Sequence, residues 1–202
     1  MKRLIRNLTA ALAVALTVLG CAGQPGGSGW VTLVDGEKGL ENFDRIGDAN
    51  WRGEGGAIVV DKATTKGASL LVSKQSWKDL EIYVEFWASE DTNSGVYLRA
   101  PNPNQVNTAS GAFEVQIWDK NPNQLYRTGS LVNVASAQPI YKAANKWNTF
   151  EVHAKGAQIT VKMNGVVTSS TDYAKTHEGR VALQFNPGTG VVKFRKLMVR
   201  PL

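Results

Sequence analysis

The sequence predicts an all-β protein that folds as a sandwich of two antiparallel sheets. Runs in which apolar and polar residues alternate recur at intervals of roughly ten to fifteen residues, with turn-forming residues between them. No window beyond residue 20 shows the 3.6-residue apolar stripe of a long helix. The pair Asn164-Gly165 between two alternating runs is a strong signal for a type I′ hairpin turn. A β-sandwich accounts for all three observations.

The first half of the domain is expected to supply short strands separated by glycine-rich turns. A strand enters a turn at 30–36, residues 51–60 have the pattern of a hairpin, and 69–73 is a short apolar strand. Alternation is clearest over 80–87 and 93–99, which we expect to be strands. The Asn- and Pro-rich segment 101–110 is long enough to be a functional rim loop.

The second half repeats this pattern after an irregular stretch at 128–141. Alternating runs at 147–153 and 158–163 predict paired strands, and the hairpin continues through 161–167. Residues 181–185 and 191–195 are expected to close the domain, with 197–199 extending the last strand. We see no internal repeat.

The strand at 112–120, A-F-E-V-Q-I-W-D-K, has an unusual polar side. Its apolar residues fall on one face, while Glu114, Gln116 and Trp118 fall on the other, and Asp119 follows where the strand should end. A carboxylate, an amide and an indole suit a sugar, because the ring stacks on its C–H faces and the polar groups bind its hydroxyls. An ordinary amphipathic strand facing water is the alternative.

Neighbouring runs supply further candidates with simpler explanations. Glu81 and Glu85, which we expect on a neighbouring strand, suit a solvated or cleft-lining face. Arg99 could form a structural ion pair with Glu85 or Glu114, or contact a ligand. Trp87 and Trp118 could stack on a sugar or fill a core. The remaining polar candidates are the structural or loop histidines His153 and His177, and Asp35 and Asp119, either of which could ligate a calcium ion.

The first twenty residues have the pattern of a secretory signal. Met1 to Arg6 is basic, and the apolar run at 8–19 is shorter than the roughly 20 residues of a spanning helix. Val18-Leu19-Gly20-Cys21 resembles a bacterial lipobox, which implies lipidation of Cys21 and an envelope location, either periplasmic or at the cell surface. A plain signal peptide and an uncleaved anchor are the alternatives. Residues 21–29 are a Gly-rich tether, and the domain is expected at 30–202.

Composition excludes several classes of function. The formal charge of +6 falls to +3 once Lys2, Arg3 and Arg6 leave with the signal, and no basic stripe suggests nucleic acid. Cys21 is the only cysteine, so a lipidated chain has no thiol for a disulfide or a nucleophile. Two histidines are too few for a His-rich metal site.

Several segments together resemble one family. They are L-V-D-G at 33–36, N-S-G-V-Y-L-R at 93–99, F-E-V-Q-I-W-D at 113–119, W-N-T-F-E-V-H-A-K-G at 147–156, V-K-M-N-G at 161–165, V-A-L-Q-F at 181–185 and V-K-F-R-K-L-M-V-R at 192–200. From residue 30 to residue 202 the chain resembles the 3-keto-disaccharide hydrolase family. The resemblance implies a concanavalin A-like jelly roll that acts on glycosides whose glucose carries a ketone at C3.

The resemblance also implies roles for particular residues. The ketone acidifies the C2 proton, a base removes it, and the glycosidic oxygen leaves by elimination before water adds. Glu114 is the acid/base candidate, Arg99 and Gln116 would hold the keto and hydroxyl oxygens, and Asp119 would orient a partner or ligate an ion. Four further residues would bind the substrate with Gln116 and Trp118, namely Asn93, Ser94, Tyr97 and Gln184.

Two other functions fit the same sequence. A non-catalytic glycan-binding module would use the same residues to hold a sugar without breaking it, and a structural envelope lipoprotein would use none of them. A laminarinase-type glycosidase needs paired carboxylates on one strand face. Because position 116 is Gln, that class is disfavoured.

Overall fold

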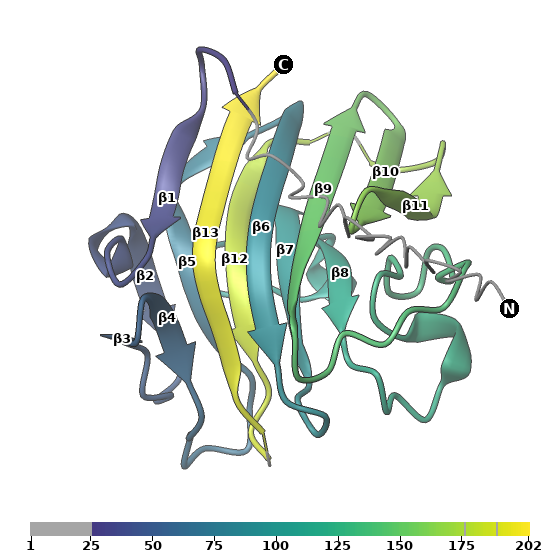
Figure 1. Cartoon of the computed structure of the whole chain (residues 1–202). Coiled ribbons are helices and arrows are strands. Elements are labelled where there is room, and N and C mark those ends of the chain that lie inside the picture. The colour runs from purple at the N-terminus through teal and green to yellow at the C-terminus, as the bar shows by residue number, and fades with distance from the viewer. Residues whose placement is uncertain (1–25, 176, 189) are drawn as a thin grey trace, which may run out of the picture.

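The computed structural model describes residues 26–175, 177–188 and 190–202, which form two antiparallel sheets packed face to face (Figure 1). The predicted all-β sandwich is confirmed. The expected signal segment, Cys21 and the first part of the tether lie outside the described residues. Among the residues described, no helix has the length and apolar character to cross a membrane.

The larger, 8-stranded sheet has the order β11-β10-β9-β6-β13-β4-β3, and β1 also pairs with β13. It lies in front in Figure 1, where β1, β13, β6 and β9 run side by side. Its strands are β1 (Val31–Asp35), β3 (Arg52–Glu54), β4 (Ala57–Val60), β6 (Leu80–Ala88), β9 (Trp147–Lys155), β10 (Gln158–Met163), β11 (Val166–Thr171) and β13 (Val192–Pro201).

The smaller, 5-stranded sheet has the order β2-β5-β12-β7-β8 and lies behind the larger one in Figure 1. Its strands are β2 (Phe43–Ile46), β5 (Ser69–Trp77), β12 (Gly179–Phe185), β7 (Ser94–Ala100) and β8 (Phe113–Ile117). Three short 3-10 helices interrupt the loops: η1 (Leu40–Asn42), η2 (Thr108–Ser110) and η3 (Gln124–Tyr126).

The core fills the space between the sheets with the apolar members of the alternating runs. Phe86 and Phe150 of the larger sheet are fully buried with ring centroids 4.6 Å apart. Leu71, Val115 and Leu183 enter the same cluster from the smaller sheet. Burial of such side chains is the main force that holds the two sheets together, because neither sheet could leave this face in water.

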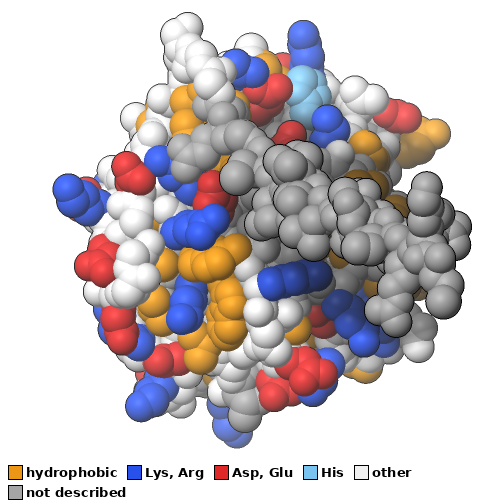
Figure 2. Space-filling model, in the orientation of Figure 1, with side chains coloured by type: hydrophobic (Ala, Val, Ile, Leu, Met, Phe, Trp, Pro, Cys, Tyr) orange, Lys and Arg blue, Asp and Glu red, His pale blue; other side chains and the backbone are white. Residues whose placement is uncertain are grey.

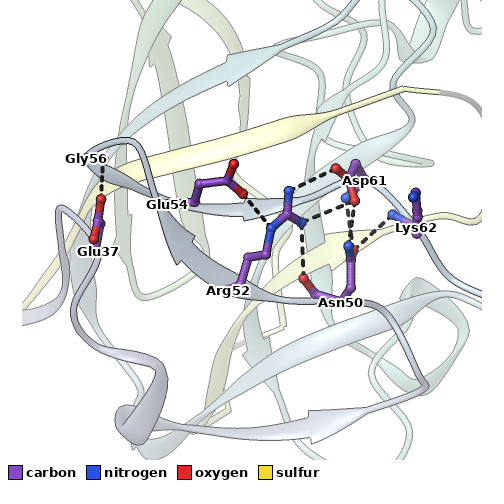
Figure 3. Close-up of polar contacts among 7 residues, drawn as sticks. All are labelled: Glu37, Asn50, Arg52, Glu54, Gly56, Asp61 and Lys62. Carbon is purple, nitrogen blue, oxygen red and sulfur yellow. Dashed lines mark hydrogen bonds and ion pairs between the residues drawn. The ribbon is translucent and has the colours of Figure 1, made fainter.

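The hairpins follow the turn chemistry of the sequence. Asn164 and Gly165 have φ angles of 51° and 81°, and positive angles at both positions are what a type I′ turn requires. At the β3–β4 hairpin the guanidinium of Arg52 bonds Glu54 and Asp61, and Asn50 donates to Asp61 at 2.6 Å (Figure 3). These polar contacts secure a hairpin at the edge of the larger sheet.

The irregular stretch at 128–141 extends the smaller sheet beyond β8. Gln116 N donates to Ser130 O at 3.0 Å, and Val132 N donates to Glu114 O at 3.0 Å. Leu131 forms an isolated bridge with Val115 and is fully buried. This segment therefore covers the edge of β8 without the alternation that would reveal a strand in the sequence.

Candidate functional site

The face of the smaller sheet that points away from the larger sheet carries the unusual side of β8. Phe113, Val115 and Ile117 enter the core between the sheets, so Glu114 and Gln116 project from the opposite face. On the adjacent strands Tyr97 lies opposite Glu114, and Gly95 lies between Gln116 and Gln184. The chain thus brings Glu114, Gln116, Tyr97 and Gln184 together from three neighbouring strands.

A second apolar cluster covers part of this face. Val106 and Ala112, from the segment that joins β7 to β8, pack with Leu70, Val72, Ala182 and other side chains of the sheet. Glu114 is 7% exposed, and Tyr97, at 3%, is buried more deeply. The predicted rim segment therefore packs onto this face of the sheet beside Tyr97, and both Tyr97 and Glu114 are removed from bulk water.

Three side chains form a hydrogen-bonded chain on this face. The hydroxyl of Tyr97 donates to Oε2 of Glu114 at 2.9 Å. Nε2 of Gln184 donates to the same Tyr97 hydroxyl oxygen at 2.9 Å. Oε1 of Gln184 is buried, and no group among the described residues hydrogen-bonds to it. This series of hydrogen bonds thus begins at the amide of Gln184 and ends at one carboxylate oxygen of Glu114.

The other carboxylate oxygen is free of protein donors. No described residue donates to Oε1 of Glu114, which lies over Gly95: a Cβ placed on Gly95 would be 2.7 Å from this oxygen. Glycine is needed here because any side chain would displace the carboxylate. The sequence contained this signal as a glycine inside a strand, but we assigned it no role. Gly95 is therefore a site residue that sequence reasoning missed.

Burial changes the acidity of Glu114. Desolvation raises the pKa of the carboxyl to about 7 from its ordinary value near 4.5, and the hydrogen bond from Tyr97 opposes that rise. No coulombic partner contributes. A carboxylate with a pKa near neutrality can both accept and return a proton, which is the property a general acid/base needs.

Gln116 supplies a donor beside this carboxylate. Its Oε1 accepts a hydrogen bond from Ile117 N at 3.0 Å, which fixes the amide plane. No described group accepts a hydrogen bond from its Nε2. The site therefore combines a free carboxylate oxygen with a free amide donor on the same strand.

Arg99 lies elsewhere, which corrects its predicted role. Between β7 and β12, Leu98 and Arg99 lie opposite the single residue Val181, so the strand bulges and Arg99 has a φ of 51°. Its side chain is fully buried, and its guanidinium donates to the carbonyl oxygens of Lys78, Gly156 and Lys175 and to the carboxylate of Asp79. Arg99 joins loops at one end of the sandwich and is not brought to Glu114.

Asp119 also has a structural environment. Its carboxylate accepts from Thr128 Oγ1 at 2.5 Å and from the backbone N–H groups of Ala143 and Ala144. It therefore anchors the long connection after β8. Among the described residues, no three His, Cys, Asp or Glu side chains gather as metal ligands. Asp35, the other calcium candidate, pairs with Lys196 at 3.0 Å.

The remaining predicted ligand residues divide between the two faces. Ser94 is fully buried, and its hydroxyl donates to Gln184 O, so it does not face Glu114. Asn93, just before β7, is half-buried and accepts a backbone bond from Asn186. Trp118 is half-buried after β8, and its backbone N–H donates to Thr128. By position, Trp118 continues the alternation of Glu114 and Gln116, and Asn93 continues that of Gly95 and Tyr97.

The strand that carries Glu81, Glu85 and Trp87 belongs to the opposite sheet. We expected it beside β8, but β6 pairs with β9 and β13. Glu81 bonds Arg200 and His153, Glu85 bonds Tyr83 and Arg195, and Trp87 lies under Lys193. The prediction that this strand neighbours the one with Glu114 is therefore wrong, because alternation within a strand does not tell which strands become neighbours.

The outer face of the larger sheet also has a groove of about 480 Å³, lined in part by Trp30, Glu81, His153, Lys162 and Arg200. Acidic and basic side chains are interspersed on the visible part of this side of the molecule (Figure 2). Most charges near the groove are already paired with each other. The groove contains none of the residues around Glu114.

Comparisons with known proteins agree with this fold. A family model described as a 3-keto-alpha-glucoside-1,2-lyase-like domain matches residues 29–200. A protein from Parabacteroides distasonis, provisionally assigned as a glycosyl hydrolase, superposes with a TM-score of 0.67 at 21% identity, over 86% of this chain and 99% of its own. No curated protein sequence matches the chain.

Two further solved structures have the same architecture at lower identity. A Bacillus subtilis protein with a galectin-like fold has a TM-score of 0.61 at 8% identity, over 83% of this chain and 93% of its own. The carbohydrate recognition domain of Emp47p has a TM-score of 0.62 at 15% identity, over 88% and 99%. At these identities the similarity concerns the fold, which is thus a jelly-roll sandwich.

Proposed function

This chain belongs to the 3-keto-alpha-glucoside-1,2-lyase-like family, and we propose that it cleaves glycosides whose glucose is oxidised to a ketone at C3. The observation that carries the proposal is Glu114: a buried carboxyl with a pKa of about 7 and one oxygen free of protein donors. Such a group suits the removal of a proton from carbon.

The first step is proton abstraction. Oε1 of Glu114 takes the proton from C2 of the sugar, and the electrons of the C2–H bond move to form an enolate with the negative charge on the C3 oxygen. Gln116 lies two residues further along the same face of β8, and its free Nε2 donor is the group that we assign to stabilise this charge. Tyr97 holds the other oxygen of Glu114 during the step.

Elimination completes the cleavage. The enolate re-forms the C3 ketone, a double bond forms between C1 and C2, and the bond between C1 and the glycosidic oxygen breaks. The leaving oxygen takes up the proton held by Glu114. Water then adds across the new double bond, so that the products are the free alcohol and the 3-keto sugar.

A non-catalytic glycan-binding module is the second candidate. The absence of Arg99 from the site favours it, because without that guanidinium the described residues offer the developing enolate only neutral donors. A binding module needs no such charge, and the amides of Gln116 and Gln184 suit sugar hydroxyls.

We also propose that the domain is anchored in a bacterial envelope. The basic start, the apolar run at 8–19 and Val18-Leu19-Gly20-Cys21 support lipidation of Cys21 after removal of residues 1–20. Incorporation of labelled palmitate into the wild-type protein but not into Cys21→Ala tests this proposal. Equal labelling of both proteins would contradict it.

Turnover of a 3-keto-glucoside tests the catalytic function. The purified protein should release the aglycone from the 3-keto form and leave the unoxidised glucoside intact. Glu114→Gln should reduce kcat/KM by at least about 100-fold, the lower end of what a general base contributes. Binding of the sugar without any turnover would favour the glycan-binding module. Unchanged turnover in Glu114→Gln would exclude Glu114 as the base.

A further inference from the structure

The hydrogen bonds around Tyr97 have a defined direction. A tyrosine hydroxyl has one hydrogen to donate, and Tyr97 donates it to Oε2 of Glu114. Its oxygen is then free to accept, and it accepts from Nε2 of Gln184. Each member of the chain is thus a donor toward Glu114, which favours a carboxylate and disfavours a protonated Oε2.

The amide of Gln184 is oriented with its donor toward Tyr97, although this orientation leaves its oxygen unpaired. Its Oε1 is buried without a partner, and a buried polar atom left unpaired costs about 1–3 kcal/mol. The reversed amide would place Oε1 against the Tyr97 oxygen, whose hydrogen is already committed to Glu114. Two acceptors would then face each other, so the amide is held with its donor toward Tyr97.

Gly95 and Tyr97 together define which oxygen of Glu114 is free. Tyr97 occupies Oε2, while Oε1 lies over Gly95, where no side chain competes for the space. One hydrogen bond and the strand surface beneath it thereby hold the plane of the carboxyl group. A half-turn of the group would exchange the two oxygens, but the arrangement would be the same: one oxygen bound to Tyr97 and the other free.

We propose that Tyr97 and Gln184 are positioning residues that hold Oε2 of Glu114 as a hydrogen-bonded carboxylate oxygen and leave Oε1 as the reacting atom. The proposal rests on the proposed function for the identity of the reaction and differs from the sequence-based expectation that both residues bind the substrate. Tyr97 and Gln184 act through Glu114 and contact no sugar atom.

Few other charges face Glu114, so the effect of Tyr97 can be isolated. The covering segment 101–112, P-N-P-N-Q-V-N-T-A-S-G-A, contains no charged residue, and neither does 128–137, T-G-S-L-V-N-V-A-S-A. On the neighbouring strands Arg99 is bound to Asp79 and backbone carbonyls, and Arg180 donates to backbone carbonyls that include Ser73 O. His177 stacks on Phe113 and its Nε2 bonds Arg99 O, and Asp119 after β8 is bound by Thr128 and two backbone N–H groups. Asp44, on the same face, is exposed at the far edge strand β2.

The test measures the titration midpoint of the Glu114 carboxyl by NMR and compares it with the pH profile of kcat/KM. Tyr97→Phe removes the bond that stabilises the carboxylate, so the midpoint of Glu114 should rise above 7 by about one unit. Gln184→Leu should raise it less, because Tyr97 remains. Side-chain carboxyl NMR of the full protein gives the midpoint without substrate, and the pH profile of kcat/KM should move with it. For both variants we expect kcat to fall with KM unchanged.

The matched control is Tyr83→Phe. Tyr83 is also a buried tyrosine that donates to a glutamate, Glu85, at 2.9 Å, but on the opposite sheet. This variant should lose a comparable hydrogen bond and leave the midpoint of Glu114 and the pH profile unchanged.

Two results would overturn the proposal. One is an unmoved Glu114 midpoint in both Tyr97→Phe and Gln184→Leu. The other is a rise in KM at constant kcat, which would mean that these residues bind the sugar. If Tyr97→Phe does not fold, Gln184→Leu alone decides. A wild-type protein that turns over no 3-keto sugar would refute the proposed function instead, and the NMR midpoints would still test the positioning.

Discussion

At the scale of single residues, Gly95 decides whether Glu114 can occupy its position. Gly95→Ala would place a Cβ 2.7 Å from Oε1 of Glu114, closer than real Cβ atoms approach, and 3.1 Å from Cγ, which is tighter than most real Cβ contacts. The carboxylate must move, and overpacking of this kind costs about 1–3 kcal/mol. We expect Gly95→Ala to lose at least about tenfold in kcat/KM, as a misplaced catalytic group does.

Gly67→Ala is the matched control for this substitution, because nothing lies within 4 Å of its added Cβ. It should leave both turnover and urea unfolding unchanged. Shortening the acid in the double variant Gly95→Ala/Glu114→Asp should recover part of the lost stability without restoring turnover. Normal turnover in Gly95→Ala would show that the carboxylate does not react from this position.

At the scale of elements, the bulge in β7 turns Arg99 into a connection between loops. Its guanidinium binds carbonyls from the β5–β6 turn, the β9–β10 turn and the segment before β12, together with the carboxylate of Asp79. Gly179 approaches so closely that a Cβ there would lie 2.3 Å from the Arg99 carbonyl carbon. Arg99 therefore holds parts of both sheets at one end of the sandwich.

Arg99→Met should destabilise the protein by at least about 3 kcal/mol, because it removes several charge-assisted hydrogen bonds, each of which contributes about 1.5–3 kcal/mol. Urea unfolding measures the change. Arg45→Met, at an exposed position of β2, is the control and should change stability by less than about 0.5 kcal/mol. If Arg99 instead bound a substrate oxygen, Arg99→Met would raise KM and leave stability nearly intact.

The turn between β10 and β11 follows from the local chemistry of its two residues. Asn164 and Gly165 adopt the positive φ angles that their residue types allow, and β10 and β11 pair on either side of them. The side chain of Asn164 also accepts from Thr149 N at 2.8 Å, which ties the turn to β9. This turn thus secures three consecutive strands of the larger sheet.

At the scale of the whole molecule, the site lowers stability at neutral pH. The pKa of Glu114 is near 4.5 in an unfolded chain and about 7 in the fold, so the folded state binds its proton more tightly. The corresponding stability is fully present below pH 4.5 and is lost as the pH rises through 7. At about 1.4 kcal/mol per pKa unit, the loss amounts to about 3 kcal/mol.

Glu114→Gln removes this titration, and the difference between the two proteins isolates it from other groups. The free energy of unfolding of the variant relative to that of the wild type, measured with urea from pH 4 to pH 9, should rise between pH 4.5 and about 7 and level off above pH 7. Asp61 and Glu81 have lowered pKa values, so their stabilising effect is lost at acidic pH and cancels in this comparison. A constant difference across the pH range would contradict the raised pKa of Glu114.

Local alternation in the sequence determined the strands, the Asn164-Gly165 turn and the side of β8 on which Glu114 and Gln116 lie. These features depend on the two-residue period of one strand and on the φ angles that individual residues tolerate. The same period also placed Tyr97 on the polar side of its strand, whereas Gln184 was named from the family resemblance.

Only the tertiary structure decided which strands meet. It separated β6 from β8, turned Arg99 inward through a bulge against β12, and bound Asp119 to the connection after β8. It also packed Val106 into one cluster with Tyr97, the hydrogen-bond partner of Glu114, and buried the carboxyl of Glu114, which raises its pKa. Strand pairing, bulges and burial depend on contacts between residues far apart in the chain, and no local period records those contacts.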